Sequence, residues 1–227
     1  MRITLKMNRD SQNLGNYEVN LKFLLDNNLI EKNDKILEIG SGKGHMLNTL
    51  KRRGFNMLGV EISQDFINQA IDEYGDMLPL KKIVDESLPF KEKVFDKVLS
   101  FDVLEHIPNT DSHLQEVRRV LKGDGEYCFG IPNRLTDEPF CLVTYKNFDY
   151  KKPGDHCSLH TYWQIKRRLI KNGFICTFFN INQDSDWIRS KVAYHFGKLG
   201  LKIFNFINID KFPIWLKPTL YVVARKK

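Results

Sequence analysis

The stretch that decides the fold of this chain is Lys35 to Leu47, KILEIGSGKGHML. A short apolar run contains an acidic residue, three glycines follow at alternate positions, and a helix start comes next. A buried strand that enters a helix through such a turn can bring its backbone close to a ligand, because glycine carries no Cβ. The rest of the sequence must show which ligand this turn holds.

From residue 17 to about 182, apolar strands and amphipathic helices alternate, which is the pattern of a mostly parallel sheet covered on both faces. The clearest helix follows Ser63 and ends at Gly75. After Pro132 the sequence predicts a long loop, and then a helix from about Thr161 to Asn172. The expected strands lie within 35–40, 55–63, 80–84, 93–101, 126–133, 174–181 and 219–225.

Length and composition fit one well-packed unit. The chain has 227 residues, of which 42% are hydrophobic, so we expect a single domain over 1–227. The first residues lack the apolar segment of a secretory signal, and no uncharged apolar run reaches the length of a bilayer span. The four cysteines form no C-x-x-C pair, which argues for reduced thiols and against zinc. We therefore expect a cytoplasmic protein, either free or peripheral at a membrane.

The formal net charge of +7 arises in the C-terminal segment. From Asp186 to Lys227, nine Lys or Arg stand against two Asp, whereas the remainder holds 26 residues of each sign. We expect residues 183–217 to form a helical insertion before the last strand. An apolar stripe with basic residues beside it runs along this segment: Ile188, Val192, Phe196, Leu199, Ile203 and Ile207, with Arg189, Lys191, Lys198 and Lys202.

Three roles are open to this basic segment. It can be a packing helix or lid over the core, which is the first choice, or it can contact an anionic membrane surface through 187–215. Contact with nucleic acid ranks third, because aromatic and aliphatic residues interleave with few charges.

The spacing of the glycines separates three possible ligands of the turn. The triphosphate-binding pattern fails, because Leu37 stands where its first glycine belongs. The dinucleotide pattern is weakened, because His45 stands where a small residue must allow close packing of helix on strand. An adenosyl cofactor without phosphates remains, since the carboxylate of Glu38 would repel a pyrophosphate.

The acidic residue and the alternate glycines resemble motif I of the class I S-adenosylmethionine-dependent methyltransferases: Glu38, Gly40, Gly42 and Gly44. Later segments resemble the same family in the same order: Glu61 at the end of the second strand, VDESLPF (84–90) with Asp85, VFDKVLSFDVLEHIPN (94–109) and EVRRVLKGDGEYCFGIPN (116–133). The resemblance implies an α/β fold, Rossmann-like and doubly wound, with a seven-stranded, mostly parallel sheet that contains one antiparallel strand.

The same resemblance implies S-adenosyl-L-methionine as the cofactor. Glu61 would accept the ribose hydroxyls, and Asp85 would accept the adenine amino group. The full expected cofactor site is Glu38, Gly40, Ser41, Gly42, Gly44, Glu61, Ile62, Asp85, Glu86, Ser100 and Phe101.

Three polar residues follow the fourth strand in SFDVLEHI. On a helix, Asp102, Glu105 and His106 would share one face, because they are three and four positions apart. The pattern resembles the E-x-x-E-H of ubiquinone-pathway O-methyltransferases and of small-RNA 2'-O-methyltransferases. That resemblance implies a magnesium ion held by these three residues, with His156 or His160 as a further ligand.

A second interpretation needs no metal. Many related methyltransferases carry Leu-Glu-His without an ion, and then His106, His156 or His160 could each act as the general base, because a neutral imidazole suits proton removal near pH 7.

We therefore expect an S-adenosylmethionine-dependent methyltransferase acting on a hydroxyl of a small-molecule, sugar or lipid-linked acceptor. In composition alone, the C-terminal segment resembles those of bacterial methyltransferases associated with cell-surface glycans and lipid-linked intermediates. Two alternatives stay open: a non-catalytic S-adenosylmethionine-binding or membrane-associated module, and an NAD-dependent oxidoreductase.

Overall fold

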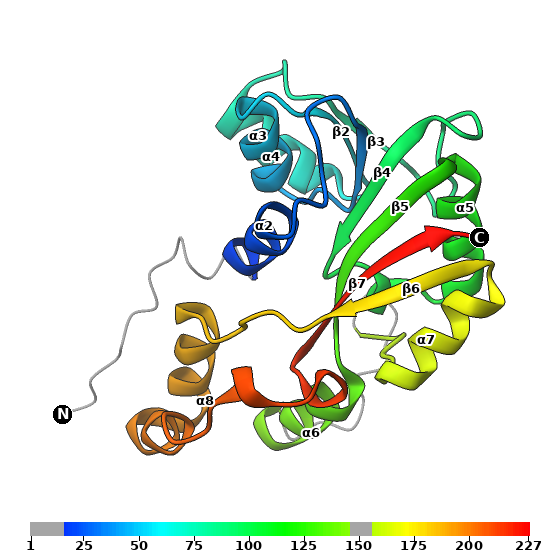
Figure 1. Ribbon diagram of the computed structural model, residues 1–227. Helices are drawn as coiled ribbons and strands as arrows, with labels where there is room; N and C mark the ends of the chain where they lie inside the picture. The colour runs from blue at the N-terminus through cyan, green and yellow to red at the C-terminus, as the bar shows by residue number, and fades with distance from the viewer. Residues whose placement is uncertain (1–15, 146–155) are drawn as a thin grey trace.

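The computed structural model describes residues 16–145 and 156–227 and contains one seven-stranded sheet (Figure 1). The strand order is β3-β2-β1-β4-β5-β7-β6. Strand β7 is antiparallel to both of its neighbours, and the pairings among β1 to β5 are parallel, which confirms the predicted fold class. The strands are β1 (Lys35–Ile39), β2 (Asn56–Glu61), β3 (Leu80–Lys82), β4 (Phe95–Phe101), β5 (Leu121–Pro132), β6 (Phe174–Phe179) and β7 (Thr219–Lys226).

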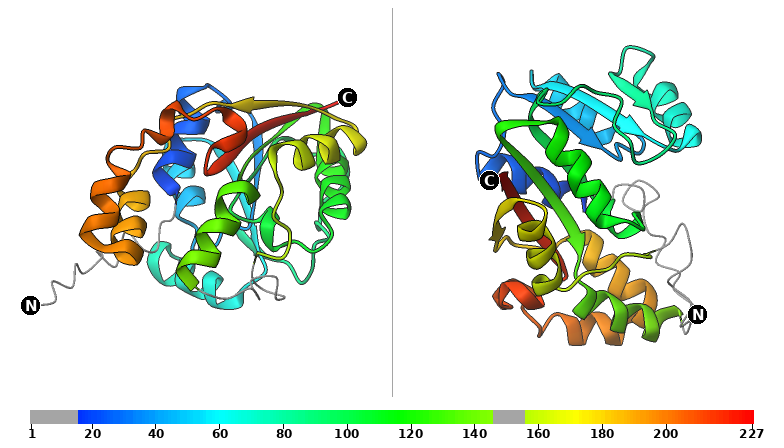
Figure 2. Two further views of the ribbon diagram at one scale, coloured as in Figure 1. Left: turned by 90° about the horizontal axis from the view of Figure 1, so that it is seen from below. Right: turned by 90° about the vertical axis from the view of Figure 1, so that its right-hand side faces the viewer.

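Helices cover both faces of the sheet (Figure 2). One buried cluster joins the sheet to α2, α3 and α4, and a second joins it to α5 and α7. Successive residues of one strand enter opposite clusters, as Ile36 and Leu37 do in β1, because side chains alternate along a strand. These helices are α2 (Tyr17–Asp26), α3 (His45–Arg52), α4 (Gln64–Tyr74), α5 (Thr110–Val120) and α7 (Tyr162–Lys171).

Two of the helices begin where the sequence predicts. The hydroxyl oxygen of Ser63 accepts the main-chain N–H of Phe66 at the start of α4. At the start of α7, Thr161 and Gln164 form a capping box, in which each side chain accepts the main-chain N–H of the other residue. Both predicted helices are therefore confirmed.

A third layer lies beyond the carboxyl ends of the parallel strands (Figure 1). It contains the 3-10 turn η1 (Leu104–His106) and the helices α6 (Arg134–Tyr145) and α8 (Asp186–Phe204). The prediction of a long loop after Pro132 is wrong where α6 stands. Asn133 starts this helix, since its side-chain oxygen accepts the N–H of Leu135, and Pro139 is tolerated inside the helix. Residues 146–155 of the predicted loop lie outside the described residues.

A second correction concerns the segment after β4. The expected helix over Asp102, Glu105 and His106 is one 3-10 turn, and Asp102 precedes it with a left-handed φ of 55°. This left-handed residue breaks the path from strand to helix, so the three side chains do not lie on one helical face.

Residues 183–217, the predicted helical insertion, contain α8, η2 (Ile209–Lys211) and η3 (Ile214–Leu216). The segment is fixed at its two ends: the Gln183 side chain hydrogen-bonds both main-chain groups of Thr219, and the buried Lys217 ammonium donates to the carbonyl of Asp210. Gly197 interrupts α8 with a φ of 65° and a ψ of −163°. Within the described part of the chain, we find no helix that is long and apolar enough to span a membrane.

Candidate active site

Glu61 holds the glycine turn between β1 and α3. One of its carboxylate oxygens accepts the N–H of Gly42 at 2.8 Å, and the other accepts the N–H groups of the next two residues at 2.9 and 2.8 Å. Gly40 has a φ of 69°, and a Cβ there would overlap Cγ2 of Val103. The turn therefore requires glycine at this position for its backbone conformation and for space.

Glu38 is a buried carboxyl at the edge of the turn. It is 5% exposed, and its Oε2 atom has no hydrogen-bond partner among the described residues. Burial raises the pKa of Glu38 to about 7, against a lowering contribution from Ser41. A buried carboxyl with one unpaired oxygen fits a cationic group that enters the cleft, and the ammonium of S-adenosylmethionine is such a group.

The cleft beside Glu38 has a volume of about 270 Å³ and receives side chains from α2, the glycine turn, α4 and the end of β4. It is lined by Tyr17, Asn20, Glu38, Ser41, Gly42, Lys43, His45, Met46, Phe66, Phe101 and Asp102. A second hollow of about 460 Å³ is lined by Ile62, Asp85, Glu86, Ser87, Ser112 and Glu116. Most of the predicted cofactor residues therefore line one of two neighbouring clefts or shape the turn between them.

Two predicted cofactor residues lie elsewhere. Ser100 is buried, and its hydroxyl hydrogen-bonds the Tyr127 hydroxyl at 2.5 Å, so it belongs to the core beneath the sheet and lines neither cleft. Gly44 begins α3 with a φ of 77°, and a Cβ there would approach the Leu78 side chain to 2.7 Å, so its role is packing of the helix.

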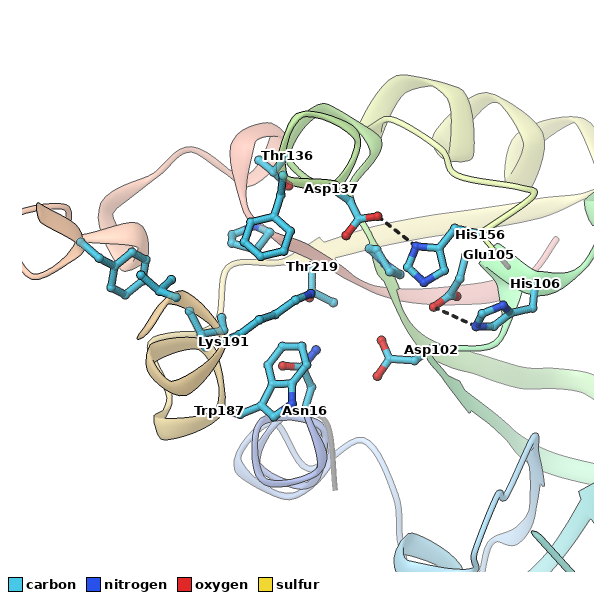
Figure 3. Close-up of a pocket in the computed structure, with 16 residues that line it drawn as sticks. Asn16, Asp102, Glu105, His106, Thr136, Asp137, His156, Trp187, Lys191 and Thr219 are labelled. Atoms are coloured by element: carbon cyan, nitrogen blue, oxygen red, sulfur yellow. Dashed lines mark hydrogen bonds and ion pairs between the residues drawn. The ribbon is translucent and has the colours of Figure 1, made fainter. Parts of the chain in front are cut away.

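A separate cavity of about 380 Å³ lies in the third layer of the fold (Figure 3). It is bounded by η1, α6, α8, the start of α2 and the start of β7. Its lining consists of Asn16, Asp102, Glu105, His106, Pro132, Thr136, Asp137, Phe140, His156, Trp187, Ile188, Lys191, Val192, Phe204, Pro218 and Thr219. A cavity of this size suits a small organic group.

Asp102 lines both this cavity and the cleft beside Glu38. Burial raises its pKa to about 6, while the neighbouring His156 and Lys191 act to lower it. The pKa of Glu105 is raised well above its usual value, by burial and then by the charge of Asp102. Burial thus acts on both carboxyls in the same direction, and the charge of Asp102 adds to its effect on Glu105.

His156 is held against η1 by neighbouring contacts. Its Nδ1 atom lies 2.9 Å from a carboxylate oxygen of Asp137, and its ring centre lies 5.2 Å from that of His106 (Figure 3). The N–H of Ser158 donates to the carbonyl of Glu105 at 2.9 Å, which ties the segment after the undescribed residues to η1. His106 and His156 are thus brought together as predicted candidates for the site.

His160 does not line the cavity. It is 5% exposed and pairs through its backbone with Asn133 and Arg134. Burial lowers its pKa to about 4, and the nearby Arg168 acts in the same direction. The structure therefore places His160 in the core, outside the lining of the cavity in which it was a predicted base or ligand.

Ligand atoms of Glu105, His106 and His156 lie within 4.8 Å of one another, and Asp102 is not part of this group. The predicted magnesium site combined Asp102, Glu105 and His106 with His156 or His160, so the structure brings three of these five candidates together. One carboxylate and two imidazoles fit Mg²⁺ poorly, because Mg²⁺ prefers oxygen ligands. We therefore derive no chemical step through magnesium.

One cation reaches into the cavity from α8. The Lys191 ammonium lies 4.6 Å from the ring centre of Phe140 and 5.1 Å from that of Trp187 (Figure 3). It also acts to lower the pKa of Asp102 and of Asp137. The cavity therefore combines an aromatic wall with carboxylates that face a single lysine.

Several lining residues escaped the sequence-based prediction. Asp137 and Phe140 lie on α6, where the proline led to the prediction of a loop. For Trp187 and Lys191, the sequence predicts only a place in an amphipathic helix. Phe66 occupies an apolar position of the helix after Ser63, yet it is 43% exposed and lines the cleft beside Glu38. The exposure of these aromatic residues could not be read from spacing, because it depends on what packs against them.

Comparisons with known proteins support the reading of the glycine turn. Residues 37–129 match the family model described as "Methyltransferase domain". The chain is 38% identical to an uncharacterised protein of Methanocaldococcus jannaschii over 54% of this chain and 46% of the relative. It is 27% identical to a ubiquinone biosynthesis O-methyltransferase of Nitrosomonas europaea, over 44% of each chain. It is 28% identical to a sarcosine/dimethylglycine N-methyltransferase of Aphanothece halophytica, over 46% of this chain and 40% of the relative. The chain thus spans less than half of the length of these relatives.

Similarity of structure extends over more of the chain. The YcgJ protein of Bacillus subtilis superposes with a TM-score of 0.64 and 15% identity, over 92% of this chain and 99% of that one. At this identity the likeness shows the fold alone. Residues 37–129 thus match a methyltransferase domain, and the fold of the chain is that of the class I S-adenosylmethionine-dependent methyltransferases.

Proposed function

We propose that the protein transfers the methyl group of S-adenosylmethionine to a hydroxyl group of a small-molecule, sugar or lipid-linked acceptor bound in the 380 Å³ cavity. The observation that carries this proposal is the position of Asp102, which lines both the cofactor cleft and the cavity. Methyl transfer needs donor and acceptor in line on either side of the transferred carbon, and a shared wall residue marks where the two meet.

The chain's own residues supply the positioning and the base. When bound, S-adenosylmethionine presents an electrophilic methyl group on a sulfonium. Glu38 would pair with its ammonium, and Glu61 and Gly42 would fix the shape of the turn beneath it. Asp102 would accept the hydrogen bond of the acceptor hydroxyl and take its proton as the new bond to carbon forms.

Glu105 and the two histidines have a different role in this proposal. Burial and the charge of Asp102 raise the pKa of Glu105, which favours a protonated carboxyl that can donate a hydrogen bond into the cavity. His156, oriented by Asp137, would place its other ring nitrogen toward the acceptor, beside His106. These side chains would orient the acceptor oxygen toward Asp102.

The experiment that tests this function has two parts. Isothermal titration with S-adenosylhomocysteine should give micromolar binding, and titration with NAD should give none; the opposite result would support an oxidoreductase. Incubation with methyl-labelled S-adenosylmethionine and a panel of hydroxyl compounds should then yield labelled methyl ethers, with no change on addition of EDTA or magnesium. Binding without label transfer to any hydroxyl would contradict the proposed reaction.

A second acceptor class is supported by one feature of the cavity. Asp102, Glu105 and Asp137 place three carboxyl groups on its wall, and carboxylates can pair with the cation of a protonated amine. One of the similar proteins is named as an N-methyltransferase. The same labelling experiment separates the two classes, because a methylated amine stays cationic in acid and a methyl ether does not.

A further inference from the structure

Helix α8 has 19 residues, and none of them is buried. This is unusual for a helix with so many apolar side chains, because packing an apolar face is what normally stabilises a helix in a globular protein. The break at Gly197 divides the helix into two parts with different surroundings. Figures 1 and 2 both show α8 at the margin of the molecule, away from the sheet.

The first part of α8 forms a wall of the cavity. Trp187, Ile188, Lys191 and Val192 line the cavity, and Phe204 at the far end of the helix lines it as well. The apolar side chains of this part therefore already have a role, which is to enclose the acceptor.

Large apolar side chains are exposed on both sides of the break at Gly197 and on the turn after α8. We call these residues the outer surface: Tyr194, Phe196, Leu199, Ile203, Phe206 and Ile207. Their exposed fractions reach 84% for Phe206, 71% for Leu199 and 70% for Tyr194. Exposure of this many large apolar side chains along one short segment marks an interaction surface.

Charge indicates the kind of partner. From Trp187 to Ile209 the sequence contains four Lys or Arg and no Asp or Glu. Two of the basic residues, Lys198 and Lys202, are exposed and stand between the apolar residues of the outer surface. Apolar side chains that insert among lipid tails, with lysines that reach the headgroups, are typical of helices at an anionic membrane surface.

We propose that the outer surface binds an anionic lipid bilayer, so that α8, which also forms a wall of the cavity, lies at the membrane. Because α8 also forms a wall of the cavity, an acceptor attached to a lipid can enter the cavity while its tail stays in the bilayer. This second statement, on the acceptor, rests on the proposed methyl transfer, whereas the membrane contact does not. A nucleic-acid partner is disfavoured, because six large apolar side chains would contact a polyanion without gain.

Vesicle sedimentation tests the membrane contact. The full chain is mixed with vesicles of phosphatidylcholine alone or with 30 mol% phosphatidylglycerol. We expect binding to the anionic vesicles at 0.1 M NaCl, at least fivefold weaker binding at 0.5 M NaCl, and weak binding to neutral vesicles. Equal binding to both kinds of vesicle, or binding to neither, would overturn the proposal.

A pair of matched variants locates the contact. The double substitution Leu199→Gln with Phe206→Gln should lower the partition coefficient about tenfold or more, because two inserted side chains are lost. The control is Met77→Gln with Ile170→Gln, which removes two exposed apolar side chains outside α8 and should change binding less than twofold. Thermal melts of both variants show whether each is folded.

Two further measurements separate the other outcomes. If size-exclusion chromatography shows a dimer that only the Leu199 and Phe206 variant dissociates, the outer surface is an interface between copies, and the membrane proposal is wrong. Tighter binding to single-stranded RNA than to anionic vesicles would also overturn it. Titration with S-adenosylhomocysteine reports on the proposed methyl transfer independently, since neither variant changes the cofactor cleft.

Discussion

The cleft beside Glu38, which we assign to the cofactor, and the cavity in the third layer, which we assign to the acceptor, differ in how the fold builds them. The cleft lies at the carboxyl ends of two adjacent strands, β1 and β4, whose positions are set by main-chain hydrogen bonds of the sheet. The cavity combines six segments that are far apart in the sequence, from Asn16 to Thr219, and its walls meet through side chains. Backbone changes should therefore damage the cleft most, and side-chain changes should damage the cavity most.

The largest effect is expected at Asp102, where the two regions meet. Asp102→Asn should lower kcat roughly a thousandfold, because the acceptor's proton loses its base, and should change the affinity for S-adenosylhomocysteine less than fivefold. The wild-type rate should rise with pH through about 6, as the Asp102 carboxyl ionises, and the variant should lose this rise. Steady-state kinetics between pH 5 and 8 measure both effects.

The exposed Asp72 of α4 gives a control for the same charge change. Asp72→Asn should leave kcat and its pH dependence within twofold of wild type. Equal losses of kcat and of cofactor affinity in Asp102→Asn would mean that Asp102 belongs to the cofactor cleft alone, and the assignment of the base would be wrong.

Two glycines of the same turn test whether changes that affect the backbone damage the cleft. Gly40→Ala should lower the free energy of unfolding by about 2 to 4 kcal/mol, because a left-handed φ and the overlap with Val103 both oppose a Cβ. Gly42→Ala should cost only about 1 to 2 kcal/mol, since φ is 51° and no atom lies within 4 Å of the added carbon. Urea unfolding followed by circular dichroism gives both values. Similar losses for the two variants would show that steric room at Gly40 is not limiting.

The same contrast explains what the sequence could predict. Glu38, the glycines and Glu61 stand at fixed spacings around one turn, so the cofactor site follows from a local pattern. The helix boundaries at Ser63 and Thr161 follow from capping, which is also local. Asp137 meets His156 across a separation of 19 residues, and no local pattern records that contact. Tertiary packing likewise decides that Ser100 and His160 turn toward the core.

Replacing Glu38 should have an intermediate effect: the protein becomes more stable, and it binds the cofactor more weakly. Its folded pKa of about 7 exceeds the ordinary value of 4.5, so the folded state holds an extra proton between these values. The stability of the unliganded protein must therefore fall as pH rises through that window. Glu38→Gln should remove this dependence and raise the free energy of unfolding at pH 8 by up to about 3 kcal/mol.

The same substitution removes the partner of the cofactor's ammonium. The Kd for S-adenosylmethionine should rise about tenfold or more at pH 8, where Glu38 is ionised in the wild type. Urea unfolding at pH 5 and pH 8, together with isothermal titration at pH 8, measures the two effects. If Glu38→Gln is less stable than wild type at pH 8, then Oε2 of Glu38 is not an unpaired buried atom in the folded protein.

The smallest effect is expected inside the cavity, where Asp137 acts on His156. Burial acts to raise the pKa of Asp137, but the hydrogen bond and charge of His156, together with Lys191 and Cys141, outweigh burial and lower it. The carboxylate therefore stays ionised and favours a proton on Nδ1 of the His156 ring. Asp137→Asn weakens that preference, and we expect a kcat loss of about tenfold with unchanged S-adenosylhomocysteine affinity.

Glu138→Gln on the same helix, which breaks an ion pair with Arg134, is the matched control and should stay near wild type. If the two variants behave alike, the orientation of His156 does not contribute to the rate, and the chemistry depends on Asp102 at the border of the cofactor cleft rather than on the assembled cavity wall.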